Sequence, residues 1–170
     1  MATEKRIIVL DDDPSAGAAV KRLLKGYGFE AEAFETVRAF RDRARLEDAS
    51  CLVLDINLDG QCGIELRKQL AAERISIPVI FVTGDDKEST KQAALQAGCV
   101  AYLQKPFPAR DLIKAADREA SKMLQCINRF LEAGSQSLLS GRTTSMICIS
   151  RRMQSWQPAS YVACSIDRRG

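Results

Sequence analysis

Short apolar runs alternate with segments of helical spacing five times between residues 5 and 131 of this 170-residue chain. A short apolar run bounded by turn signals is typical of a buried strand, and regular alternation with helices indicates a parallel sheet. The strand-like runs occupy residues 7–10, 29–34, 51–54, 79–82 and 99–103. The sequence therefore predicts an α/β fold of the doubly wound class, with a five-stranded parallel sheet and helices on both faces.

Helix start signals lie between the strand-like runs. Asp13 directly before Pro14 is a favourable N-cap, with proline at the first helical position. Thr36 is expected to cap the second helix. A third helix should follow a loop at residues 56–62, and a fourth is expected over residues 87–97. Asp13 is therefore interpreted as a helix cap and not as a metal ligand.

The last helical pattern is longer than a small sheet can cover. Its apolar stripe comprises Leu112, Ile113, Ala116, Ala120, Met123, Leu124, Ile127, Phe130 and Leu131. The distal half of this stripe has no expected place to bury. Two interpretations stay open, a frayed or back-folded end and a helix for dimerisation or linkage.

Carboxylates follow the first and third strand-like runs. Asp11 and Asp12 come directly after the first run, and Asp55 comes directly after the third. The carboxyl ends of parallel strands share one edge of the sheet, where ligands bind in folds of this class. Acids this close repel one another unless one is protonated or a cation lies between them. An all-oxygen cluster suits a hard ion such as Mg²⁺.

A hydroxyl and an ammonium group are expected at the same edge. The fourth strand-like run ends at Thr83, and the fifth leads to Lys105. The chain contains no histidine, which excludes His-based triads and a phosphorylated histidine in this chain. Its six cysteines form no Cys-x-x-Cys pair, so we interpret them as reduced thiols. Carboxylate, lysine and hydroxyl chemistry remains.

This set of residues resembles the receiver domain of bacterial two-component response regulators, over about residues 5–122. The resemblance implies the flavodoxin-like strand order 2-1-3-4-5. It makes Asp55 the phosphoacceptor, with a sensor histidine kinase or a His phosphotransfer protein as donor. Asp12 and Asp55 would bind Mg²⁺ together with the main-chain carbonyl of Asn57, and Asp11 would act through water. Lys105 would pair with a phosphoryl oxygen.

The resemblance also implies a switch. Thr83 and Tyr102 match the pair of residues that convert phosphorylation into a change of surface shape. The surface formed by the fourth helix, the fifth strand and the fifth helix would then dock a partner or a second copy as a homodimer. Pro106 would follow a cis peptide bond. The chain would not be an enzyme, beyond slow self-catalysed phosphoryl transfer and hydrolysis.

Two residues depart from the family pattern. Asp59 stands where a proline is usual, and Cys62 stands where Asp or Ser is common. Asp59 and Gly60 can still form a turn. The departure keeps open a second hypothesis, a pseudo-receiver that serves as a phosphorylation-independent interaction or dimerisation module. A phosphatase with an Asp nucleophile is weaker, because Asn57 stands where a general acid would be needed.

The chain divides into a receiver domain at residues 1–124, an extension of the last helix at 125–133 and a basic, Ser-rich tail at 134–170. The tail carries five arginines and one aspartate, a charge of +4, so the net charge of +3 leaves −1 for residues 1–133. We expect this tail to be poorly ordered. It shows no recognisable output domain, so DNA binding by this chain is not expected.

No apolar run approaches the length of a membrane span, which needs about 18 residues. The four aliphatic residues after Arg6 are too few for a signal peptide. We therefore expect a cytoplasmic protein with no membrane contact.

Overall fold

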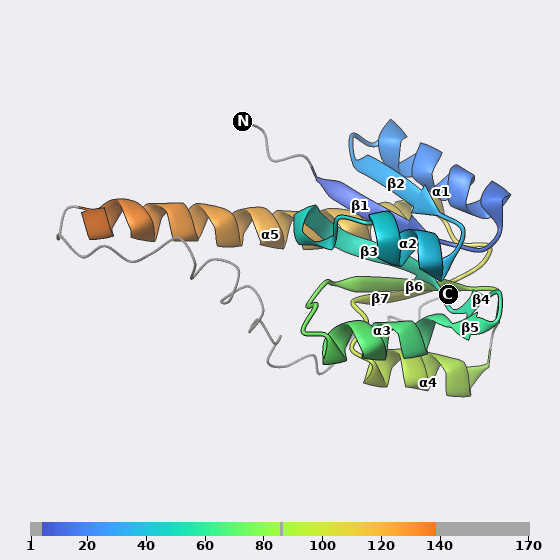
Figure 1. The fold of residues 1–170 in the computed structure, drawn as a ribbon. Coiled ribbons are helices and arrows are strands. Elements are labelled where there is room, and N and C mark those ends of the chain that lie inside the picture. Colours follow the sequence, from blue (N-terminus) through green and yellow to red (C-terminus); the bar gives the residue numbers. More distant parts are fainter. Residues whose placement is uncertain (1–4, 86, 139–170) are drawn as a thin grey trace, which may run out of the picture.

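Five parallel strands form the central sheet of the computed structural model, which describes residues 5–85 and 87–138, with side chains up to residue 129 (Figure 1). The strands are β1 (Arg6–Leu10), β2 (Glu30–Phe34), β3 (Ala49–Asp55), β6 (Val79–Thr83) and β7 (Ala101–Gln104). Their order is β2-β1-β3-β6-β7, and every neighbouring pair is parallel. This is the predicted order 2-1-3-4-5, so the predicted fold class is confirmed.

Helices cover both faces of this sheet. They are α1 (Pro14–Gly26), α2 (Val37–Arg43), α3 (Gly63–Ala72), α4 (Glu88–Gln96) and α5 (Ala109–Leu138), with a 3-10 turn at Leu46–Asp48. One buried cluster joins α1 and α5 to the sheet, and the other joins α2, α3 and α4 to it. The helices therefore lie two on one face and three on the other, as a doubly wound sheet requires.

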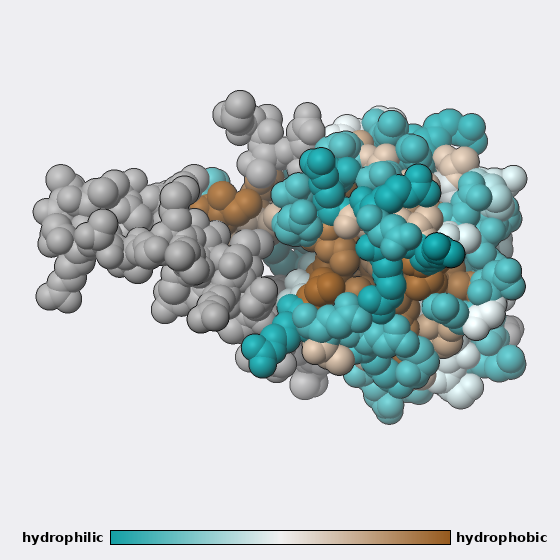
Figure 2. Space-filling model, viewed as in Figure 1, coloured by the Kyte–Doolittle hydropathy of each residue, from teal (hydrophilic) through white to brown (hydrophobic). Residues whose placement is uncertain are grey.

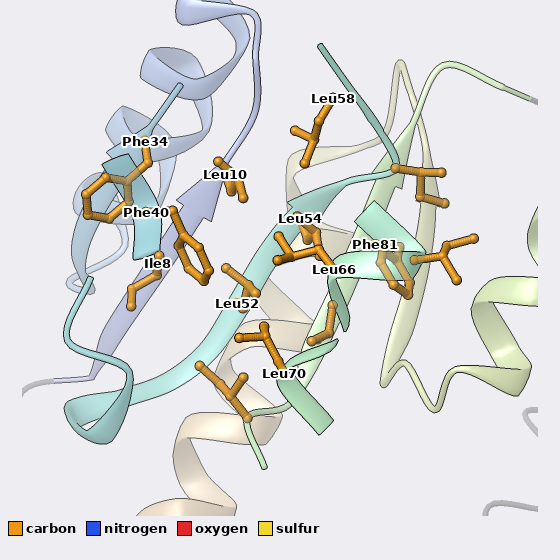
Figure 3. Close-up of a cluster of buried hydrophobic side chains, with 14 of the residues drawn as sticks. Ile8, Leu10, Phe34, Phe40, Leu52, Leu54, Leu58, Leu66, Leu70 and Phe81 are labelled. Atoms are coloured by element: carbon orange, nitrogen blue, oxygen red, sulfur yellow. The ribbon is translucent and has the colours of Figure 1, made fainter. Parts of the chain in front are cut away.

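Alternate residues of the strands supply the two clusters. Ile7 and Val9 of β1 face the cluster of α1 and α5, whereas Ile8 and Leu10 face the opposite cluster. Figure 3 shows the second cluster, in which Phe40 and Phe81 lie on opposite sides of the leucines of β3 and α3. All seven residues of β3 are buried. From Cys51 to Leu54 the central strand is apolar, and it then ends at the buried carboxylate of Asp55.

The predicted helix caps are present. The Asp13 carboxylate accepts a hydrogen bond of 2.8 Å from the backbone N–H of Ser15, and Pro14 is the first residue of α1. The Thr36 hydroxyl accepts one of 3.1 Å from the backbone N–H of Ala39. Asp13 is thus the cap that the sequence predicts, and its carboxylate satisfies a free N–H group of the helix.

A small hairpin replaces part of the predicted loop at residues 56–62. Strands β4 (Asn57–Leu58) and β5 (Gln61–Cys62) pair antiparallel. Gly60 at their turn has φ of 71°, a value that glycine adopts without a Cβ clash. Leu58 is buried, which anchors the hairpin to the core. Asp59 and Gly60 therefore form the predicted turn.

Helix α5 continues to Leu138, five residues beyond the predicted end at residue 133, and projects well past the sheet (Figure 1). Gly134 costs a helix only about 1 kcal/mol relative to alanine, so it does not by itself end one. The rest of the predicted tail, residues 139–170, lies outside the described residues. Among the described helices, none has the length and apolar character needed to cross a membrane.

Candidate functional site

Three carboxylates meet at the carboxyl ends of β1 and β3. Asp11 and Asp12 follow β1, and Asp55 is the last residue of β3, the strand that pairs with β1. One ligand oxygen from each residue lies within 4.8 Å of the others. Asp11 is 1% exposed and Asp55 is 6% exposed, while Asp12 is exposed. The cluster thus has two buried acids and one that opens to solvent.

Lys105 bridges the two buried carboxylates. Its Nζ donates to Asp11 Oδ2 at 2.7 Å and to Asp55 Oδ2 at 2.6 Å. The lysine follows β7, and its backbone N–H donates to the carbonyl of Thr83 at 2.7 Å. The peptide bond between Lys105 and Pro106 is cis, as predicted. The ammonium group therefore offsets the repulsion between the acids.

The charge state of Lys105 reflects two opposing effects. Partial burial lowers its pKa, because burial penalises the charged form. The hydrogen bonds and attraction to Asp11 and Asp55 outweigh burial, so the pKa of Lys105 is raised above its ordinary value of 10.5. The side chain consequently carries its positive charge at neutral pH.

The remaining oxygen of Asp55 is bound by the following loop. The backbone N–H of Asn57 donates to Asp55 Oδ1 at 2.8 Å, so each carboxylate oxygen has one donor. The Asn57 side chain donates from Nδ2 to the hydroxyl of Thr83 at 3.3 Å. Thr83 ends β6 and is fully buried. Asp55 and Thr83 are thus connected through one residue.

Asp85 connects Thr83 to Tyr102. The backbone N–H of Asp85 donates to the Thr83 hydroxyl at 3.0 Å, and its carbonyl accepts from the Tyr102 hydroxyl at 3.0 Å. Its carboxylate binds the start of α4, through the backbone N–H of Lys87 and the hydroxyl of Thr90. These contacts, the Lys87 N–H first, lower the pKa of Asp85. The two predicted switch residues are therefore linked by a short chain of hydrogen bonds.

Sequence reasoning missed two features of this site. A Cβ on Gly63 would lie only 2.1 Å from the carbonyl oxygen of Asp55, so the first residue of α3 must be glycine. No local pattern signals this restriction, because it arises from the approach of the Asp55 backbone. The second feature is Asp85, whose backbone link between Thr83 and Tyr102 carries no sequence signal.

The family model of the response regulator receiver domain matches residues 7–117, which is more than half of the chain. The chain therefore belongs to the receiver domain family of two-component response regulators. Receiver domains accept phosphoryl groups from histidine kinases and bind Mg²⁺ at an acidic cluster. Asp11, Asp12 and Asp55 form a group of this kind here.

Particular relatives support the assignment. Nodulation protein W of Bradyrhizobium diazoefficiens is 33% identical over 114 residues, covering 67% of this chain and 50% of that protein. Transcriptional regulatory protein FixJ of the same organism is 32% identical over 123 residues, covering 71% of this chain and 60% of that protein. The chain thus spans about half the length, or slightly more, of these curated relatives.

Solved structures agree with the observed fold. The response regulator StyR is 33% identical with a TM-score of 0.66, over 82% of this chain and 71% of that chain. The FixJ-N structure is 27% identical with a TM-score of 0.62, over 69% of this chain and 94% of that chain. The likeness thus covers the receiver part of the chain, which functions in two-component signalling.

Proposed function

We propose that this receiver is a phosphorylation-activated switch in which Asp55 accepts the phosphoryl group. The observation that carries the proposal is the setting of the Asp55 carboxylate. This carboxylate lies at the end of the central strand, with Asp11 and Asp12 beside it. One of its oxygens accepts a hydrogen bond from Lys105 and the other accepts one from the backbone N–H of Asn57. A nucleophilic carboxylate needs such orientation and a means of offsetting its neighbours' charge.

In the transfer step, one Asp55 carboxylate oxygen forms a bond to phosphorus while the bond from phosphorus to the donor's histidine nitrogen breaks. The electron pair of the broken bond leaves with the imidazole of the sensor kinase or His phosphotransfer protein. Lys105 then exchanges its ion pair with Asp55 for one with a phosphoryl oxygen. The chain needs no acid or base of its own for this step, in keeping with its lack of histidine.

The donor atoms at the site fit Mg²⁺, because they are all oxygens and lie within 4.8 Å of one another. Asp12 and Asp55 would hold the ion directly with the main-chain carbonyl of Asn57, and Asp11 would act through water. When bound, Mg²⁺ supplies positive charge that stabilises the phosphoryl oxygens. The exposed position of Asp12 gives the ion and the donor a side from which to enter.

The output of the switch follows the hydrogen bonds from Thr83 to Tyr102. A phosphoryl oxygen on Asp55 would be a new acceptor for the Thr83 hydroxyl, which already contacts Asn57 and Asp85. Movement of Asp85 would alter the hydrogen bond that holds the Tyr102 ring. The surface of α4, β7 and α5 would change shape. A partner or a second copy would then bind this altered surface in the cytoplasm.

The alternative, a phosphorylation-independent pseudo-receiver, rests on Asp59 in the place of a proline. Asp59 lies in the turn between β4 and β5, where Gly60 supplies the unusual backbone conformation. Asp59 is exposed, and it is not one of the three carboxylates of the acidic cluster. This placement supports a working switch over the alternative.

Acetyl phosphate with Mg²⁺ tests the proposal on the full chain. We expect covalent labelling that alkali and hydroxylamine remove, because both reagents cleave an acyl phosphate. Asp55→Asn should abolish it, while the matched control Asp59→Asn, a nearby exposed acid, should retain it. Unlabelled wild-type protein, or labelling that survives Asp55→Asn, would contradict the assignment.

A further inference from the structure

The distal part of α5 carries apolar side chains that the described core does not cover. The buried cluster on this face of the sheet ends at Ala120. Met123, Leu124 and Ile127 are only partly buried and belong to neither core cluster. Figure 2 shows hydrophobic surface on the described part of α5 where the helix leaves the domain. We call residues 121–138 of α5 the stem.

The apolar spacing of the packed half of α5 continues through the stem. Its backbone is helical to Leu138. Steps of four and three residues connect Ala120, Leu124, Ile127, Leu131, Gly134 and Leu138. This is the heptad spacing that positions a and d take in a coiled coil. The spacing of the stripe therefore suits packing against a second helix as well as against the sheet.

The flanks of the stripe suit a copy of the same helix. With Leu124 at position a, the flanking e and g positions are Ser121, Met123, Asn128, Phe130, Ser135 and Ser137, none of them charged. Lys122 and Arg129 fall at position f, on the opposite side of the helix. Like charges at e and g would repel across a homodimer, and opposite charges would select a different partner. Uncharged flanks do neither, so two copies of this helix can pair without charge repulsion.

The length of the stem also favours a covering partner. Its 18 residues span about 27 Å at the usual helical rise. A helix of this length is marginal in water unless an apolar face packs against something, and glycine and serine in its last turns weaken it further. A second stem supplies such packing along the whole stripe.

We propose that the stem pairs with the stem of a second copy of this chain as a two-stranded coiled coil. The interface uses the a and d residues Leu124, Ile127, Leu131 and Leu138. It lies on the part of α5 that follows the packed segment ending at Ala120, and it uses no residue of the acidic cluster. The proposal goes beyond the switch function and does not depend on it.

Sedimentation velocity of the full chain over a concentration series tests the pairing. We expect a reversible dimer whose dissociation constant rises about 100-fold or more in Leu124→Glu/Ile127→Glu, because the pairing would bury charges. The matched control Gln125→Glu/Cys126→Glu adds the same charge at two exposed positions off the stripe and should stay dimeric. Circular dichroism and acetyl phosphate labelling show that each variant keeps its receiver domain folded.

Three outcomes would overturn the pairing. The first is a wild-type chain that is monomeric at every concentration, which would result if residues 139–170 covered the stem instead. The second is a dimer that Leu124→Glu/Ile127→Glu does not weaken. The third is a control variant whose dimer dissociates equally. Absence of acetyl phosphate labelling in a dimeric wild-type protein would contradict the switch function and leave the pairing intact. The two proposals therefore fail separately.

Discussion

Lys105 and Asp55 form an ion pair of 2.6 Å although 50 residues separate them in the chain. The carboxyl ends of β3 and β7 bring them together, and the same ammonium group holds Asp11 at 2.7 Å. One lysine thus neutralises part of the charge of two buried acids. This arrangement stabilises the resting domain and, in the proposed mechanism, supplies the cation that meets the phosphoryl group.

Lys105→Met should lower the free energy of unfolding by about 2 kcal/mol, because it leaves two buried carboxylates without their shared donor. Urea unfolding in the presence of EDTA measures this change in the free energy of unfolding. Added Mg²⁺ should recover much of the loss, because the ion replaces the missing positive charge. Lys114→Met, at an exposed position of α5, is the control and should change stability little. A Lys105→Met protein as stable as wild type without Mg²⁺ would show that the ion pair contributes nothing.

The ion pair also predicts how stability depends on pH. The pKa of Lys105 in the folded state is raised above its ordinary value of 10.5. Its contribution is therefore fully present below pH 10.5 and is lost as the pH rises through the higher folded-state pKa. The stability difference between wild type and Lys105→Met should stay constant near neutral pH and shrink only in strongly alkaline solution. A difference that shrinks between about pH 6 and 8 would point to another group.

Gly63→Ala should destabilise the domain by about 3 kcal/mol, because the new Cβ would lie 2.1 Å from the carbonyl oxygen of Asp55 and must push backbone aside. The displaced end of β3 should also slow acetyl phosphate labelling. Gly26→Ala, at the end of α1, is the matched control, since a Cβ there meets nothing within 4 Å. Thermal unfolding of the two variants checks the contrast. Equal stability would mean that α3 can shift without cost.

The apolar pattern was sufficient to predict the parallel sheet and the acidic cluster, while the strand order followed from the family resemblance. Apolar runs ending in Asp11, Asp12 and Asp55 carry this information locally, because the strands of a doubly wound sheet end at one edge. The runs that end at Thr83 and lead to Lys105 placed both residues at this edge, and only their predicted roles depended on the family resemblance. Their distances from other groups could not be predicted, because they depend on packing between distant segments.

Other features lay beyond a local pattern. The hairpin of β4 and β5 was predicted as a loop, since two-residue strands show no periodicity. The restriction at Gly63 arises from the approach of Asp55, eight residues earlier, which no spacing rule reports. The helix extension was predicted to end at residue 133, where the composition becomes Ser-rich, whereas the described α5 continues to Leu138. The cost of one glycine, Gly134, does not end the helix.

Thr83→Val should keep acetyl phosphate labelling but uncouple it from Tyr102. Valine has nearly the same shape and leaves the backbone N–H of Asp85 without its acceptor. We expect wild-type protein to show altered hydrogen exchange at Asp85 on addition of beryllofluoride and Mg²⁺, and Thr83→Val to show no such change. Thr83→Ser keeps the hydroxyl and should restore the response. If Thr83→Val responds as wild type does, the switch does not depend on this hydroxyl.

Two neighbouring acids should differ sharply in their effect on Mg²⁺ binding. Asp12 belongs to the acidic cluster, whereas the Asp13 carboxylate caps α1 through the N–H of Ser15. Asp12→Asn removes a charged ligand and should weaken Mg²⁺ binding, measured by isothermal titration calorimetry, by roughly tenfold or more. Asp13→Asn should bind Mg²⁺ nearly as wild type does and keep its stability, because asparagine caps helices as well as aspartate. Equal losses in the two variants would mean that general negative charge, and not a defined ligand set, attracts the ion.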